Sequence, residues 1–159
     1  MNEQTEQQKK TASALQDLLT RAYDAEQGYH NAAEAISHDR LKSLFHEYAE
    51  QRKSFGHDIK ALIVKNGETP DKGASALGKL HQFWIDFRGM LTGGGEADII
   101  EECRRGEETT MSDYEDYIND LEISAEAREL FSQQLEKVRT IYSRLTSLEN
   151  KAAAAEAVR

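Results

Sequence analysis

The sequence is poor in the residues that cross-link chains and break helices. Its 159 residues include one cysteine, Cys103, so an internal disulfide framework and a multi-cysteine metal site are both excluded. There is one proline, Pro70, and the glycines gather mainly in the stretches 67–73 and 93–95. Because helices end where proline and glycine lie, most of the chain is free to be helical.

Long apolar runs are also missing. No stretch approaches the ~18 uninterrupted apolar residues of a membrane-spanning helix, and residues 1–10, MNEQTEQQKK, lack the apolar core of a secretory signal. Acidic residues outnumber basic ones by 29 to 20, which gives a net charge of −9. Nucleic acids and anionic membranes repel such a chain. We therefore expect a cytoplasmic protein that binds neither nucleic acid nor membrane.

Apolar residues recur at helical spacing along most of the chain, and alternating runs typical of strands are absent. The pattern predicts five helices within a single domain spanning 1–159, over residues 11–37, 39–66, 74–91, 96–121 and 124–151. Capping residues lie at or near three of the starts: Asp39, Ser75 and Ser124. The ends, 1–11 and 152–159, are expected to fray because they have little apolar surface to bury.

Four of these helices carry one apolar stripe each, and such helices bury their stripes against one another as a bundle. Short links join the first two helices and the last two, while the crossover 67–95 is long enough to run the length of the bundle. The stretch 44–50, LFHEYAE, resembles 130–136, LFSQQLE. This repeat favours two helical hairpins with an additional helix, 74–91, in the crossover. The ordinary likeness of amphipathic helices is the alternative explanation of the repeat.

Four polar residues interrupt the apolar stripes near the middle of their helices: Glu26, Arg52, Glu107 and Gln134. Each lies four or seven residues from apolar members of its stripe, and this spacing places it on the same helical face. Burying such a group without a partner is costly. We therefore predict one central polar layer, in which Arg52 pairs with Glu26, Glu107 or both. Several of the six tyrosines are expected to be core residues whose hydroxyls join this layer or reach the surface.

Four short stretches carry a family resemblance: Glu26-Gln-Gly-Tyr29, Tyr48-Ala-Glu-Gln-Arg52, His81-Gln-Phe-Trp84 and Arg105-Gly-Glu107. Together with the bundle plan, they resemble the ferritin-like superfamily, and more closely a bacterial family of small ferritin-like bundle proteins without assigned function. The resemblance covers roughly residues 12–150 and implies an all-α, ferritin-like four-helix bundle. Diiron members of the superfamily hold metal with one Glu from each of two helices and Glu-x-x-His from the other two. Glu26 and Glu107 match the two lone glutamates.

The remaining ligands of that motif are missing. None of the five histidines has Glu or Asp three residues before it, and the second helix offers Arg52 at an inward position. A guanidinium cannot ligate iron, and it repels a cation. The favoured hypothesis is therefore a non-enzymatic bundle protein in protein interaction or stress response, with no cofactor, whose structural Glu/Arg polar core replaces a diiron site. One alternative is an atypical iron or manganese carboxylate protein that uses Glu26 and Glu107; another is a module that binds a small apolar ligand beside helix 74–91.

The Glu–His pairs on the first two helices and the single cysteine each have a structural and a functional interpretation. Glu26 and His30 are four residues apart, as are His46 and Glu50, and this spacing suits a small surface metal site. Solvated side chains are the expectation, because His30 lies at the edge of its stripe and His46 on the outer face. Cys103 lies on an apolar stripe and is expected to be a small core residue, not a redox thiol. No catalytic residue is indicated.

The helix expected over 74–91 predicts a homo-oligomer, most simply a dimer. Its apolar arc includes Phe83, Trp84, Phe87 and Met90, and is wider than one packing surface requires. Exposed aromatic residues and methionines commonly mark interfaces. A helix sunk into a groove between two bundle helices is the alternative.

Sedimentation of the wild type and of the variant Phe83→Asp/Met90→Asp tests this interface. We expect a wild-type dimer that dissociates in the variant, because two charges would be buried against the partner copy. A wild type that stays monomeric at high micromolar concentration excludes the interface. A dimer that survives both charges places it elsewhere.

Overall fold

The computed structural model describes residues 5–71 and 95–157. Four helices lie in these ranges: α1 (Glu6–Ala35), α2 (Asp39–Lys65), α4 (Glu96–Asn119) and α5 (Ala125–Ala157). The described ranges contain no strand, so the expected all-α class is confirmed. The helix expected over 74–91 lies outside the described residues, together with Ser75 and the interface residues Phe83, Trp84, Phe87 and Met90.

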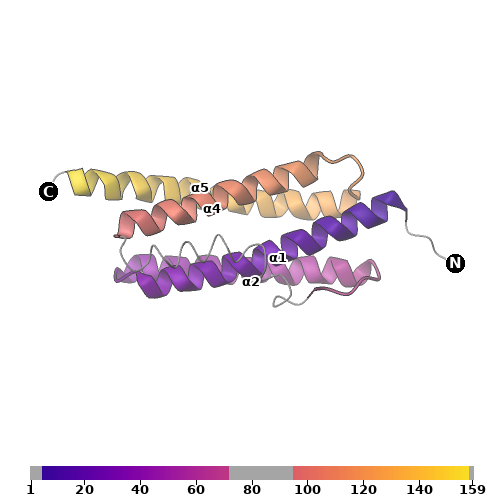
Figure 1. Ribbon diagram of the computed structural model, residues 1–159, viewed down its shortest axis with the longest axis horizontal. Helices are drawn as coiled ribbons and strands as arrows, with labels where there is room; N and C mark the ends of the chain where they lie inside the picture. Colours follow the sequence, from indigo (N-terminus) through magenta and orange to yellow (C-terminus); the bar gives the residue numbers. More distant parts are fainter. Residues whose placement is uncertain (1–4, 72–94, 158–159) are drawn as a thin grey trace.

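The four helices form two antiparallel hairpins (Figure 1). α1 packs along α2, α4 packs along α5, and the hairpins meet through α1 against α4 and α2 against α5. The expected bundle of two hairpins is therefore confirmed. No helix of the described ranges is long and apolar enough to cross a membrane.

Two helices are longer than expected at the chain ends. α1 begins at Glu6 because Thr5 and Gln8 form a capping box: the Thr5 hydroxyl accepts from the Gln8 amide at 3.1 Å, and the Gln8 side chain accepts from the Thr5 amide at 2.9 Å. α5 continues to Ala157 through a stretch rich in alanine, the residue with the highest helix propensity. The structure gives Glu6 to 11 and 152 to Ala157 as helical, and fraying of the ends stays a prediction.

The two helices that follow short links begin at side-chain caps. At α5 the Ser124 hydroxyl accepts from the amide of Ala127 at 3.2 Å, as expected for a cap. At α2 the cap is His38, whose ring nitrogen accepts from the amide of Leu41 at 3.4 Å. Asp39, the expected cap, is instead the first helical residue, where its negative charge lies favourably near the helix N-terminus.

α2 ends in a turn that needs glycine. Gly67 has a φ of +82°, a conformation that L side chains adopt only with strain. The Gly67 amide donates to the carbonyl of Val64 at 2.9 Å, and the Glu68 amide donates to the carbonyl of Ile63 at 3.1 Å. These two bonds satisfy carbonyls that the last helical turn leaves unpaired, which is the Schellman arrangement.

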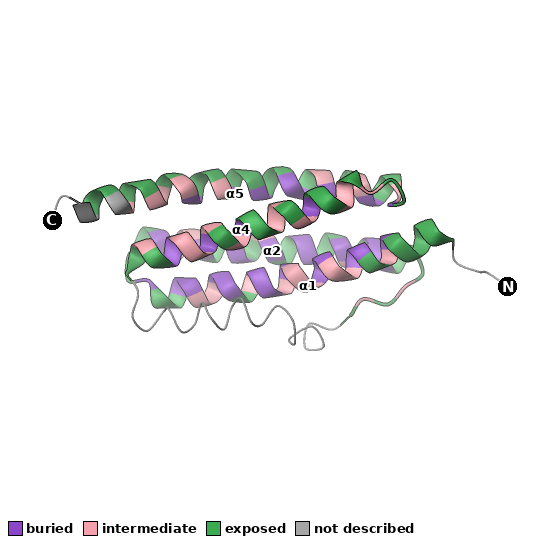
Figure 2. Ribbon diagram, turned by 45° about the horizontal axis from the view of Figure 1, so that its top comes forward, coloured by how far each residue is buried: buried purple, intermediate pink, exposed green. Residues whose placement is uncertain are grey.

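The core consists of two clusters of buried apolar side chains, one toward each end of the bundle. Figure 2 shows buried residues in purple along all four helices. On α2, Ala49 belongs to one cluster and Phe55 to the other, with Arg52 between them. On α4, Glu107 lies between Cys103 of one cluster and Tyr114 of the other. Arg52 on α2 and Glu107 on α4 therefore both lie at the boundary between the two clusters.

Candidate functional site

A buried ion pair lies at the junction of the two apolar clusters. Arg52 on α2 and Glu107 on α4 are 1% and 2% exposed, and Nη2 of Arg52 donates to Oε2 of Glu107. Among the described helices, α2 and α4 are not a pair that packs side by side. The ion pair therefore crosses the interior of the bundle and joins one hairpin to the other.

Aromatic rings enclose the guanidinium. The Arg52 Cζ lies 5.8 Å from the ring centroid of Tyr29 and 5.3 Å from that of Phe55, within the range of cation–π attraction. The Tyr29 hydroxyl is also buried in this region, where the Glu107 carboxylate helps to raise its pKa. The Tyr29 ring packs in turn against Phe45 and Tyr48, at centroid distances of 6.2 and 5.4 Å. The guanidinium of the ion pair thus lies between the rings of Tyr29 and Phe55.

The charges and protons of this cluster are fixed at neutral pH. Burial disfavours the charged guanidinium, but the Glu107 carboxylate outweighs it, so the pKa of Arg52 lies above its ordinary value. Burial, assisted by Glu107, raises the pKa of the Tyr29 hydroxyl well above its usual range. Burial likewise raises the pKa of the Cys103 thiol. Cys103 is therefore a core residue and not a reactive thiolate.

A second set of hydrogen bonds ties α5 into the same region. The Tyr114 hydroxyl donates to Oε1 of Gln134 at 2.6 Å, and Nε2 of Gln134 donates to the backbone carbonyl of Phe55 at 3.3 Å. Gln134 is buried, as expected, and it links α4, α5 and α2. Tyr29 and Tyr114 thus place their hydroxyls in the polar layer, whereas Tyr117 donates to Asp17 at 2.5 Å in a part-buried setting.

The structure does not bring all four predicted residues together. Arg52, Glu107 and Gln134 are buried, while Glu26 is half-buried and has no hydrogen bond or ion pair with any other described residue. Asp24, two residues earlier on α1, is buried and was not singled out from the sequence. Its position between Ala22 and Ala25, which belong to the core, is the signal that could have identified it.

The residues at the centre do not fit a diiron cofactor. Glu107 is already paired with a guanidinium, which has no lone pair to offer a metal and carries a positive charge. In residues 5–71 and 95–157, no group of three or more His, Cys, Asp or Glu side chains is arranged to hold a metal ion. We therefore derive no metal chemistry from this centre.

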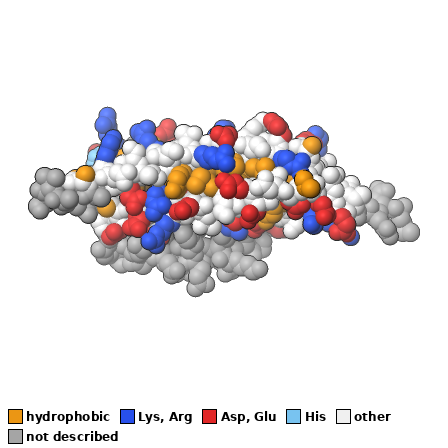
Figure 3. All heavy atoms as spheres, turned by 90° about the horizontal axis from the view of Figure 1, so that it is seen from above, with side chains coloured by type: hydrophobic (Ala, Val, Ile, Leu, Met, Phe, Trp, Pro, Cys, Tyr) orange, Lys and Arg blue, Asp and Glu red, His pale blue; other side chains and the backbone are white. Residues whose placement is uncertain are grey.

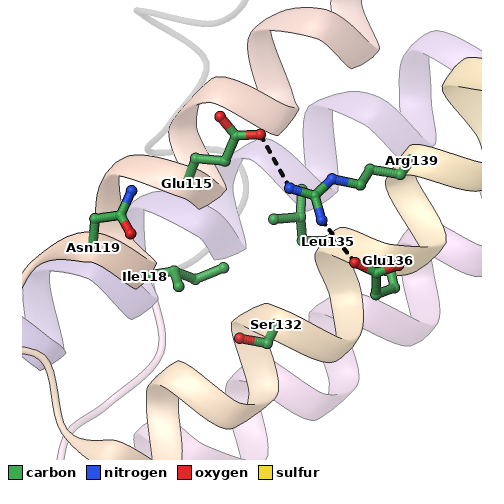
Figure 4. Close-up of a pocket in the computed structure, with 7 residues that line it drawn as sticks. All are labelled: Glu115, Ile118, Asn119, Ser132, Leu135, Glu136 and Arg139. Carbon is green, nitrogen blue, oxygen red and sulfur yellow. Dashed lines mark hydrogen bonds and ion pairs between the residues drawn. The ribbon is translucent and has the colours of Figure 1, made fainter.

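The surface between α4 and α5 carries a shallow groove of about 340 Å³ (Figure 4). Arg139 lies on its rim and pairs with Glu136 at 2.7 Å and with Glu115 at 3.3 Å. Ile118 and Leu135 add apolar surface. Ser132 is the single nucleophilic hydroxyl of the lining, and no histidine or cysteine accompanies it, so the lining holds no Ser–His or Cys–His pair. Figure 3 shows this side of the molecule, where acidic and basic side chains surround small hydrophobic patches.

Comparison with known proteins gives a family without an assigned activity. Residues 10–120 match the family described as a domain of unknown function, DUF2383. This segment is more than half of the chain and contains Glu26, Arg52 and Glu107. No curated protein matches the chain.

Removing one member of the central ion pair should destabilise the protein more than removing both. Arg52→Met or Glu107→Leu leaves the other charge buried without its partner, at about 3–5 kcal/mol. The double variant Arg52→Met/Glu107→Leu leaves no unpaired charge, so its free energy of unfolding is expected near the wild-type value. Urea denaturation of the wild type, the two single variants and the double variant measures the interaction energy between Arg52 and Glu107.

Arg139→Met is the matched control for this cycle, because the exposed Arg139 pairs at the surface and its loss is expected to destabilise the protein far less than the loss of either buried charge. Single variants that are as stable as the wild type would contradict a structural role for the pair.

The buried tyrosines predict a loss of stability in alkali. Burial raises the pKa of Tyr48 to about 12 and also raises those of Tyr29 and Tyr114. In the unfolded chain a tyrosine titrates near pH ~10. The unfolded chain therefore loses these protons first, and the free energy of unfolding is unchanged by them below about pH 10 and falls as the pH rises above it.

Urea denaturation across this pH range, with tyrosinate absorbance of the folded protein, checks the prediction. Tyr48→Phe should weaken the decline between pH ~10 and about 12. Folded protein in which every tyrosine titrates together near pH ~10 is the contrary result.

Proposed function

The chain belongs to the DUF2383 family, and from its interior we propose that it is a non-enzymatic, cytoplasmic helical bundle protein of ferritin-like plan. It acts through its surface in protein interaction or stress response and needs no cofactor. Its Glu/Arg polar core is structural and lies where a diiron protein would bind its metal ions. The observation that carries this proposal is the buried Arg52–Glu107 pair.

The pair supports a structural role because its charges and hydrogen-bonding partners come from the protein itself. The resemblance to diiron proteins matches Glu107 to one of their two lone glutamates, yet its carboxylate is paired with Arg52. A general base or metal ligand needs a lone pair that is open to a reactant. Glu107 has its partners inside a closed layer that is 2% exposed.

The packing of the interior also favours a protein that acts at its surface. The void beside Arg52, lined by Leu18, Phe55 and Tyr114 among others, measures about 10 Å³. That volume is at the lower limit for a single water molecule and is far below that of a substrate. Two large apolar side chains of the described ranges, Leu121 at 91% and Val64 at 60%, are exposed. Such side chains, with the mixed charges around them, are available for contacts with another protein.

The alternative, an iron or manganese site formed by Glu26 and Glu107, has no observation in its favour. In the described part of the chain the two glutamates share no interaction, and the one that is buried is neutralised by Arg52. A metal ion at Glu107 would have to displace or tolerate the guanidinium, and both are electrostatically unfavourable.

Metal content and iron oxidation test this proposal. Protein purified without a chelator is expected to contain far less than one equivalent of iron or manganese, and to oxidise Fe²⁺ in air no faster than Arg52→Met/Glu107→Leu does. Glu34→Gln, which changes an exposed carboxylate on α1, is the control for general charge effects. One or more equivalents of iron or manganese, lost in Glu26→Gln and in Arg52→Met/Glu107→Leu but kept in Glu34→Gln, would establish the alternative.

A further inference from the structure

Away from the polar core, two histidines from different helices meet on the outside of the first hairpin. His30 on α1 and His46 on α2 have their Nδ1 atoms 3.2 Å apart. Their ring centroids are 5.4 Å apart and the rings are tilted by 50°. His46 is exposed and His30 is half-buried, so the pair is accessible from solvent while the packing of α1 on α2 fixes its position.

Each histidine has a carboxylate one helical turn away. Glu26 precedes His30 by four residues, and Glu50 follows His46 by four residues. Residues four apart are neighbours on a helix surface. Because α1 and α2 run antiparallel, both glutamates lie on the same side of the histidine pair along the hairpin. Neither has a hydrogen bond or ion pair with another described residue, so both are free to change rotamer.

The separation of the two nitrogens suits ligation of one metal ion. Zn²⁺–nitrogen bonds of about 2.0–2.1 Å at a tetrahedral angle place the two nitrogens about 3.3 Å apart, and the Nδ1 atoms lie at 3.2 Å. Without metal, one Nδ1 must carry the proton that the other accepts. When a metal ion binds, the ring that carries the Nδ1 proton takes its Nε2–H tautomer by proton exchange with water, so both neutral rings offer an Nδ1 lone pair to the ion.

We propose that His30 and His46 bind a divalent transition-metal ion of the Zn²⁺ type, with Glu26 and Glu50 completing the ligand set together with water. In the present rotamers no third His, Cys, Asp or Glu of the described ranges is in position. The carboxylates therefore reach the metal by side-chain rotation, while the two imidazoles are already placed. Imidazole and carboxylate are both ordinary ligands of Zn²⁺.

This site is separate from the Arg52–Glu107 centre and needs none of its residues. It joins α1 to α2 through their side chains, so a bound ion stabilises the first hairpin. Because the ion binds the folded chain, its effect on stability grows with the ratio of free metal to the dissociation constant.

Calorimetric titration of the tag-free, metal-stripped full chain with ZnCl₂ tests the proposal. One Zn²⁺ per chain is expected, together with a rise in the thermal midpoint. His30→Ala and His46→Ala should each weaken binding by at least about tenfold, and Glu50→Gln by a smaller factor. His57→Ala, which removes another exposed histidine of α2, is the matched control and should leave the affinity unchanged.

Circular dichroism of each variant verifies that it folds, which is expected because both histidines lie at the surface. Arg52→Met/Glu107→Leu should retain zinc, and this result separates the histidine site from the polar core. The absence of zinc binding by the wild type overturns the proposal, as does undiminished binding by His30→Ala/His46→Ala.

Discussion

The requirement that Arg52 and Glu107 remain paired constrains the whole bundle. A charge that is 1–2% exposed is tolerable only with its partner, and here the partners belong to different hairpins. Neither hairpin alone can satisfy its own central charge. The position of one hairpin along the other is therefore set by the level at which Arg52 meets Glu107. The hydrogen bond from Gln134 to the carbonyl of Phe55 fixes α5 against α2 near the same level.

The apolar clusters on either side of the ion pair supply most of the buried surface, but they do little to fix the position of one hairpin along the other. Leucine, isoleucine and alanine side chains pack without directional bonds, so a core of these residues tolerates different arrangements of similar volume. The layer of Tyr29, Arg52, Glu107, Tyr114 and Gln134 adds directional bonds, from Arg52 to Glu107 and from Tyr114 to Gln134, that only one arrangement satisfies. We regard the layer as the element that selects one register from the several that apolar packing allows.

Sequence periodicity identified Arg52, Glu107 and Gln134 as members of this layer, but it did not decide whether Arg52 pairs with Glu26 or with Glu107. Helical spacing is a local property, and it places Arg52, Glu107 and Gln134 on buried faces because apolar residues flank them on the same stripe. Which glutamate meets Arg52 depends on the distance across the bundle, and no pattern within one helix contains that distance. Glu26 shows the difference: it shares a stripe with core residues yet is half-buried, as a long side chain can bury its stem and keep its charged end in water. The contact between His30 and His46 likewise depends on the register of α1 against α2, although their spacing from Glu26 and Glu50 is evident in the sequence.

The central pair also orders the events of folding. Each hairpin can form from its link outward, starting with contacts such as that of His30 and His46, which are 16 residues apart, and such local contacts form fast. Arg52 and Glu107 are 55 residues apart and belong to different hairpins, so they meet only when the hairpins dock. An interaction absent from the transition state acts mainly on the rate of unfolding. We therefore expect the ion pair to slow unfolding and so lengthen the lifetime of the folded chain, while the rate of folding stays nearly unchanged.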